Sequence, residues 1–341
     1  MGEDHAILRA AIIGRLSQKE PSAIWPALGD SGVVPLCVPV DLGGLGLGVA
    51  DAEPVLDALG ECCAASSFLE TSIIAARLLG LSRTDAGDEI LRRIATDHWR
   101  VAVAGLDARL RGNVRAHCSD GHWMIDGSAP IVLDADVSDA ILVVAQYDGK
   151  PAIFLVPEKS QFERRGFPTI DGRNAADLSF HQTPVIPIAT DATGILEIVS
   201  DEAVACLAIE ASSLMCRLVH DTVVYAKQRE QFGQSIGRFQ VIQHRLVDMN
   251  IQARRSGAIA RKAMAALAGP QIERERAVSA AKVTVAQAGR FIGQQAVQLH
   301  GGMGMTIELP IGRCFKRLTV IESELGDADQ HLERFSATMS A

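Results

Sequence analysis

The strongest constraint on the fold of this chain is a stripe of small and apolar residues near its C-terminal end. The residues of the stripe are Val278, Ala281, Val285, Ala288, Ile292, Ala296 and Leu299. A recurrence every three or four positions places all of them on one face of a single α-helix. Gly301 and Gly302 follow directly and favour the end of that helix. We expect such a long stripe to be buried in a helix bundle.

Other helical segments occur at both ends of the chain. Stripes of the same kind run over about 201–228 and 238–267, so residues 191–341 are predicted to form a C-terminal four-helix bundle. Residues 1–98 are predicted to form an N-terminal helical domain. Its apolar residues at helical spacing are Leu8, Ile12 and Leu16, and then Val55, Leu59 and Cys62.

The middle of the chain, residues 99–190, has a different texture. Short apolar runs begin near residues 101, 113, 122, 139, 151 and 177. Turn signals such as "SDG" and "YDGK" separate them, which predicts a small, central antiparallel β-domain. Strands placed between two helical blocks predict the α+β fold class.

Composition limits the kinds of partner and compartment. The chain has 341 residues, 33 Lys plus Arg against 41 Asp plus Glu, and a net charge of −8. Without a basic tract or an N-terminal targeting pattern, we expect neither a nucleic-acid partner nor a membrane partner. The seven cysteines lack metal-ligand and CxxC spacing, so they are interpreted as reduced core thiols of a cytoplasmic protein, and no metal site is expected.

The segment 226–240, "AKQREQFGQSIGRFQ", contains the chemistry that most favours a ligand. Arg229 offers a guanidinium suited to phosphate, while Gln231 and Phe232 offer an amide and a ring to a flat ligand. A second motif, "QLHGGMG", supplies Gln298 and a turn of bare backbone. The alternative interpretation is a solvated helix end beside an ordinary core aromatic.

The two motifs together, "RxQFGxxIGxFQ" followed by "QLHGGMG", resemble the C-terminal half of the acyl-CoA dehydrogenase family of flavoproteins. The resemblance implies the family's order of helical domain, β-domain and four-helix bundle. It also implies FAD, an acyl-CoA substrate, an electron-accepting protein and an oligomer. In the family, the matching residues reach across a subunit interface to the ADP arm of FAD. The positions that would do so here are Arg229, Gln231, Phe232, Gln298, Gly301 and Gly302.

Two segments that line the flavin in the family have no counterpart here. The family's "TEPxxGSD"-like segment is replaced by "VAVAGLDARLRGN", and its "WITN"-like segment is replaced by "SAPIVLDADVSD". Trp123 is the nearest indole, but it lies on an earlier predicted strand and is interpreted as core. A subunit without both segments is expected to hold its own flavin poorly.

The family's catalytic glutamate is also missing from both of its usual positions. Alignment by the motifs puts these positions at Leu325 and Ala203, although Glu324 and Glu202 are their neighbours. One residue turns a helical side chain by about 100°, so a neighbouring carboxylate faces elsewhere unless the register shifts. Glu324 leads the candidates for a displaced base, ahead of the three other glutamates weighed, which are Glu202, Glu210 and Glu322.

Three functional hypotheses follow from these observations. The favoured one is a subunit that pairs with a distinct, longer partner in an α2β2 acyl-CoA dehydrogenase, with the catalytic base on the partner. In this respect the chain resembles the short subunits of bacterial steroid-degrading heterotetramers, which act on side-chain or ring CoA esters. The alternatives are a self-sufficient homo-oligomer that uses a displaced base such as Glu324, and a non-enzymatic relative that no longer binds FAD. The sequence names neither the acyl group nor the electron acceptor.

Overall fold

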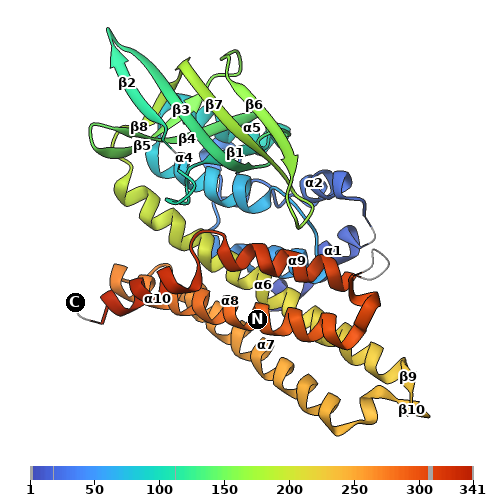
Figure 1. The fold of residues 1–341 in the computed structure, drawn as a ribbon. Helices are drawn as coiled ribbons and strands as arrows, with labels where there is room; N and C mark the ends of the chain where they lie inside the picture. Colours follow the sequence, from blue (N-terminus) through green and yellow to red (C-terminus); the bar gives the residue numbers. More distant parts are fainter. Residues whose placement is uncertain (1–2, 18, 112, 306–309, 340–341) are drawn as a thin grey trace. The chain divides into compact units, whose positions relative to one another are not determined.

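The computed structural model describes residues 3–17, 19–111, 113–305 and 310–339 (Figure 1). Contacts within the chain group into two compact units. The helical unit comprises Met1–Lys19, Glu53–Ala64 and Val204–Ala341, and the sheet unit comprises Glu20–Ala52 and Ala65–Ala203. The order of helices, sheet and helices along the chain confirms the predicted α+β fold class.

The helical unit is built mainly from the C-terminal third of the chain. Its helices are α1 (Glu3–Leu16), α3 (Glu53–Cys62), α6 (Thr193–Gln228, from residue 204), α7 (Gln240–Ala266), α8 (Gln271–His300), α9 (Pro310–Ser323) and α10 (Ala328–Ala337). Helix α8 packs against α7, α9 and α10. All seven residues of its predicted stripe are buried, which explains this central place in the bundle.

Helix ends in this unit follow their local sequence. Helix α8 ends where Gly301 adopts φ 61°, and the corner after α9 places Leu325 and Gly326 at φ 57° and 103°. Helix α10 then begins with a capping box, in which Asp327 and Gln330 each accept a hydrogen bond from the other's backbone N–H. The corner between α9 and α10 is therefore fixed on both sides.

Helix α6 is long and apolar enough to cross a membrane by length and composition alone. However, 78% of its most apolar window is buried within the protein. Such burial is typical of a core helix, since a spanning helix would present this surface to lipid.

The sheet unit contains one mixed eight-stranded sheet. Its strands are β1 (Val101–Ala104), β2 (Arg115–Ser119), β3 (His122–Leu133), β4 (Ala140–Tyr147), β5 (Lys150–Val156), β6 (Glu163–Pro168), β7 (Asn174–Pro184) and β8 (Ile186–Ala189). Their order is β6-β7-β3-β2-β4-β5-β8, with β1 paired to β4. The sheet is antiparallel as predicted except where β1 and β2 run parallel to β4. The chain reverses from β2 to β3 and again from β3 to β4, which explains why β2 and β4 run in the same direction.

The core of the sheet is formed by aliphatic residues around Phe154 and Phe180, both fully buried. Trp123 packs at its margin, with its ring centroid 4.7 Å from that of Tyr147 and 5.4 Å from that of Phe154. The interpretation of Trp123 as a core residue is therefore confirmed.

Helices and one unusual segment complete the sheet unit. They are α2 (Pro21–Asp30), the π-helix η3 (Phe68–Ala75), α4 (Ala76–Ser82) and α5 (Asp85–Asp97). Every residue of η3 is buried, including Glu70. Apolar periodicity cannot reveal a π-helix, because the segment is enclosed on all sides.

The seven cysteines are all free. Cys37, Cys206 and Cys314 are buried, as expected of core thiols. Cys118 and Cys216 are exposed, so the prediction of a core position was wrong for these two. Cys118 lies on β2, where most residues are solvated, and Cys216 faces solvent on a helix otherwise rich in buried residues.

Candidate functional site

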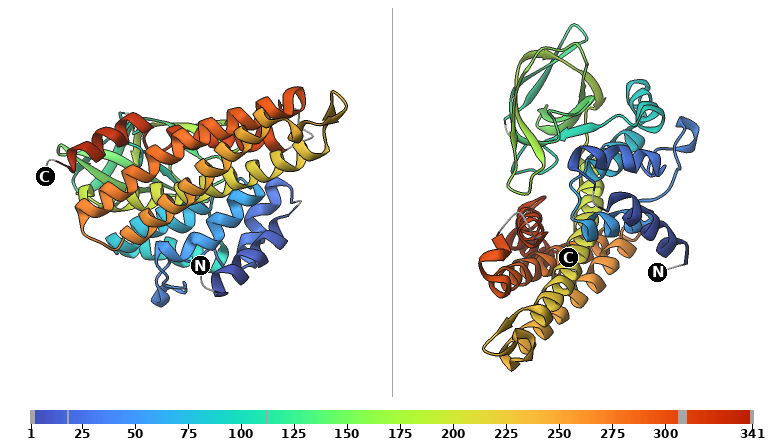
Figure 2. Two further views of the ribbon diagram at one scale, coloured as in Figure 1. Left: turned by 90° about the horizontal axis from the view of Figure 1, so that it is seen from below. Right: turned by 90° about the vertical axis from the view of Figure 1, so that its right-hand side faces the viewer.

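A short hairpin joins α6 to α7 and carries the first motif. Strand β9 (Glu230–Gln231) pairs antiparallel with β10 (Gln234–Ser235), and Figure 2 shows this hairpin at one end of the two helices. Phe232 and Gly233 form its turn with φ 54° and 79°, the backbone that a tight two-residue hairpin requires. A bulky residue adopts this conformation at a cost, yet Phe232 is 91% exposed. The hairpin thus presents the ring outward.

Arg229 has a fixed backbone and a free side chain. Its amide donates to the Tyr225 carbonyl over 2.8 Å, and its own carbonyl accepts from the Ile236 amide over 2.9 Å. The side chains of Arg229 and Gln231 are exposed and form no hydrogen bond or ion pair with any residue the structure describes. A guanidinium and an amide are therefore available to a ligand or to another chain.

The second motif forms an open turn at the end of α8. The Gly301 amide donates to the Gln298 carbonyl, and Gly301 adopts φ 61° and ψ −141°, which only glycine reaches readily. A Cβ on Gly301 or Gly302 would meet no atom within 4 Å, so this backbone is uncovered. Gly304 is different, because a Cβ there would lie 2.9 Å from the Val297 carbonyl oxygen.

The two motifs are joined by a ring contact. The rings of Tyr225 and His300 stack with centroids 4.3 Å apart and 26° between their planes. The Tyr225 hydroxyl also donates to the His300 carbonyl over 3.4 Å. Tyr225 was not singled out from the sequence; its position one helical turn before Arg229 was the only available signal.

His300 is buried and hydrogen-bonded within its own helix. Its Nδ1 atom lies 2.8 Å from the Ala296 carbonyl, which can only accept, so Nδ1 carries the proton. Burial lowers the pKa of His300 below its ordinary value, which keeps the ring neutral. The ring is therefore a fixed, uncharged part of the turn.

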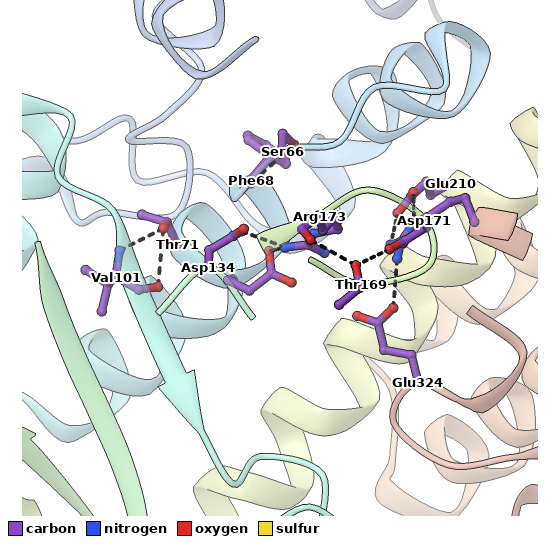
Figure 3. Close-up of polar contacts among 12 residues, drawn as sticks. Ser66, Phe68, Thr71, Val101, Asp134, Thr169, Asp171, Arg173, Glu210 and Glu324 are labelled. Atoms are coloured by element: carbon purple, nitrogen blue, oxygen red, sulfur yellow. Dashed lines mark hydrogen bonds and ion pairs between the residues drawn. The ribbon is translucent and has the colours of Figure 1, made fainter. Parts of the chain in front are cut away.

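Glu324, the leading candidate for a displaced base, is engaged in an ion pair. Its carboxylate accepts from Arg317 Nη1 over 3.0 Å, and Arg317 also binds Glu210 over 2.7 and 2.9 Å (Figure 3). Arg317 is only 7% exposed. Lys282 donates to the carbonyls of Ile321 and Glu324 and so holds the same corner. Glu324 as a base remains a prediction.

The other carboxylates near the two base positions are also paired. Glu202 receives three hydrogen bonds of 2.7 to 3.1 Å from Arg77, and Glu322 is bound by Arg290. Ala203 itself is fully buried. Glu202, Glu210 and Glu322 are therefore each held by a guanidinium from another helix, and Glu324 is held by Arg317 of the helix that it follows.

In the sheet unit, the segment that replaces the family's "WITN"-like residues is bonded internally. The Ile131 amide donates to Asp177 over 3.0 Å, with Ile131 itself at φ 52°. Asp134 accepts from the buried Arg173 over 2.7 Å (Figure 3), and Glu70 of the π-helix pairs with the same guanidinium. These contacts bond the segment within the sheet unit.

The exposed residues of the two motifs fit the ADP arm of a dinucleotide. They offer a cation, amides, a ring and open backbone, which suit a pyrophosphate and a purine. Both motifs follow the C-terminal ends of helices, α6 at Gln228 and α8 at His300, where the helix dipole is negative. An anion bound there would depend on Arg229 for compensation. Among the described residues, no group of three or more His, Cys, Asp or Glu could hold a metal.

Residues 201–339 match the family described as "Acyl-CoA dehydrogenase, C-terminal domain". The C-terminal part of the chain is therefore similar to the acyl-CoA dehydrogenases, a family of oxidoreductases.

Individual relatives extend this similarity over nearly the whole chain. Acyl-CoA dehydrogenase FadE27 of Mycobacterium tuberculosis is 27% identical over 96% of this chain and 91% of its own length. The ChsE4-ChsE5 complex from Mycobacterium tuberculosis contains a chain with 24% identity and a TM-score of 0.85, covering 100% of this chain and 98% of that one. The Tcur3481-Tcur3483 steroid ACAD G363A variant gives 23% identity and a TM-score of 0.86, covering 98% and 96%.

Proposed function

We propose that this chain is a subunit of an FAD-dependent acyl-CoA dehydrogenase, in which a distinct and longer partner supplies the catalytic base. One observation carries the proposal: the side chains of the cofactor motifs are exposed and available, whereas the glutamates near both base positions are held by arginines. The exposed motif side chains favour binding of a cofactor that reaches in from another subunit. The arginine-bound glutamates favour removal of the α-proton by a residue of the partner.

Bound FAD would supply the acceptor for a hydride from the β-carbon of the acyl thioester, and a carboxylate would remove the α-proton. This chain's share of the work is to hold the cofactor. Arg229 binds phosphate, Gln298 and the open backbone of Gly301 and Gly302 bind the adenosine end, and Phe232 excludes water beside it. The internally bonded segment around Ile131 supports a weak hold on a flavin of the chain's own.

The partner and substrate class are proposed by analogy with two of the similar structures. One is a complex of ChsE4 with ChsE5, and the other is a steroid ACAD of two differently numbered components. We propose an α2β2 assembly that oxidises a steroid-type side-chain or ring CoA ester in the cytoplasm and passes electrons to an acceptor protein. The identity of the acyl group is left to experiment.

The test is expression of this chain alone and together with longer acyl-CoA dehydrogenases from the same organism, each offered as the candidate partner. Alone, the chain is expected to be colourless. With its partner, it is expected to purify as a yellow complex that reduces an artificial electron acceptor with a steroid CoA ester. A yellow, active homo-oligomer obtained from this chain alone would overturn the proposal in favour of a self-sufficient enzyme.

The cofactor role is tested separately by Arg229→Ala in the complex. Loss of a charge-assisted bond to phosphate is expected to weaken FAD binding by about 1.5 to 3 kcal/mol, measured by FAD titration of the apoprotein. Arg255→Ala, which removes another exposed arginine of the helical unit, is the matched control. Unchanged FAD affinity in Arg229→Ala would remove the assignment.

A further inference from the structure

The geometry points to Tyr225 and His300 as a positioning pair, a ring clamp that holds the Arg229 hairpin and the glycine turn in one fixed arrangement for the cofactor. The inference rests on the proposed function, because it assumes that both motifs bind one FAD. Neither ring is placed as a contact to the cofactor. Their proposed role is to set where the groups that do bind are found.

The first step concerns the hairpin. The Tyr225 carbonyl accepts from the Arg229 amide over 2.8 Å, so this hydrogen bond joins the last turn of α6 to the first residue of the motif. The Tyr225 side chain meanwhile stacks on His300 at 4.3 Å. One residue thus contacts the first motif through its backbone and the second motif through its ring.

The second step concerns the glycine turn. His300 immediately precedes Gly301, whose φ of 61° reverses the chain at the end of α8. No side chain packs on Gly301 or Gly302, since a Cβ on either would meet nothing within 4 Å. The direction of this uncovered turn therefore depends on how His300 is held. Tyr225 holds it twice, by the ring stack and by the hydroxyl bond to the His300 carbonyl.

The third step concerns the choice of residue types. The Nδ1–H of His300 donates to the Ala296 carbonyl, which fixes the plane of the imidazole against α8. A flat ring in that plane offers a face to Tyr225, and offset aromatic faces attract each other beyond simple burial. An aliphatic side chain at either position would fill space without fixing an orientation.

The experiment compares substitutions that keep the stack with substitutions that remove it, in the co-expressed complex. Tyr225→Leu and His300→Leu are each expected to weaken FAD binding about 10-fold, and the double substitution should cost little more than either one. Tyr225→Phe keeps the ring and is expected to stay within about 2-fold of the parent protein. FAD titration of each apo complex gives these values.

A second measurement reads the clamp without FAD. In the purified chain with labelled histidine, NMR is expected to show His300 neutral with its proton on Nδ1. Ile292→Ala, a buried substitution on the α8 stripe, is the matched control for general loosening of the bundle. It should lower the unfolding temperature while FAD affinity at low temperature is retained.

The outcomes separate this inference from the proposed function. If Tyr225→Leu and His300→Leu keep their FAD affinity while Arg229→Ala loses it, the clamp is refuted and the proposed function stands. If all three variants keep their FAD affinity, the cofactor-binding role of this chain is itself refuted. An Nε2-protonated or charged His300 in the folded chain, or a loss of FAD in Ile292→Ala as large as in the leucine variants, would also overturn the clamp.

Discussion

Individual side chains of the same type have opposite environments in this protein. Arg229 is exposed and without a bonded partner among the described residues, whereas Arg317 is buried between two carboxylates. An exposed, unbonded guanidinium keeps its capacity to bind phosphate. A buried one is needed to neutralise the charges around it, because carboxylates removed from water are costly to leave unpaired. Exposure and pairing therefore distinguish an arginine that is available to a ligand from one that stabilises the fold.

This difference predicts an unequal response to loss of two arginines that pair with glutamates on or near α9. Arg317→Leu leaves Glu210 and Glu324 buried without their cation and is expected to lower the free energy of unfolding by about 3 to 5 kcal/mol. Arg290→Ala removes an exposed partner of Glu322 and is expected to change stability little. Urea denaturation of the isolated chain measures both. Equal effects would contradict the structural role given to Arg317.

At the scale of elements, the β9–β10 hairpin combines a strained backbone with an exposed ring. Phe232 occupies a left-handed turn position for which asparagine is much better suited. The folded chain buries little of the ring, since 91% of Phe232 is exposed and its ring meets that of Phe239 edge-to-face with centroids 6.2 Å apart. The proposed function gives this exposed ring a contact outside the chain.

Phe232→Asn is therefore expected to separate stability from function. Relief of the left-handed strain should leave the unfolding free energy of the isolated chain unchanged or raise it by about 1 kcal/mol, measured by denaturation. FAD retention in the complex is expected to fall. Phe232→Ala removes the ring but keeps the strained backbone, so it should lose FAD without the gain in stability. A destabilised Phe232→Asn chain would contradict this account.

Elements with a strong period were predictable from the sequence, and those without one were not. The apolar stripe predicted helix α8, and the apolar runs predicted strands β4 and β5, all of which are present. Edge strands β6 and β8 were missed, because β6 is mostly exposed and has no apolar run, and β8 is short. The site shows the same division. The binding motifs are local in sequence, whereas the pairs Arg77–Glu202 and Arg317–Glu210 join residues from distant segments and leave no local signal.

At the scale of the whole molecule, the proposed function gives the two units unequal relations to the cofactor. The helical unit carries the exposed groups of the two motifs, and the sheet unit bonds its candidate flavin-facing segment internally through Asp134 and Asp177. Under the proposal, this chain offers half of a site, and a partner with an intact flavin-facing segment completes it.

The assembled enzyme is therefore expected to contain about half as many FAD molecules as polypeptide chains. The sites made from the partner's sheet and this chain's hairpin should be filled, and the reverse sites should be empty. Flavin absorbance against protein concentration in the purified complex gives the ratio. A ratio near one FAD per chain would show that the sheet unit of this chain also holds flavin.

The sharing of Arg317 by two glutamates has a consequence for how easily this corner can change. A Glu324 released to act as a base would need a rearrangement of the arginine that now neutralises both Glu210 and Glu324. Displacement of Arg317 alone would leave both carboxylates without their cation, which destabilises the protein. The corner is therefore resistant to single substitutions, because each first step would pass through a less stable protein.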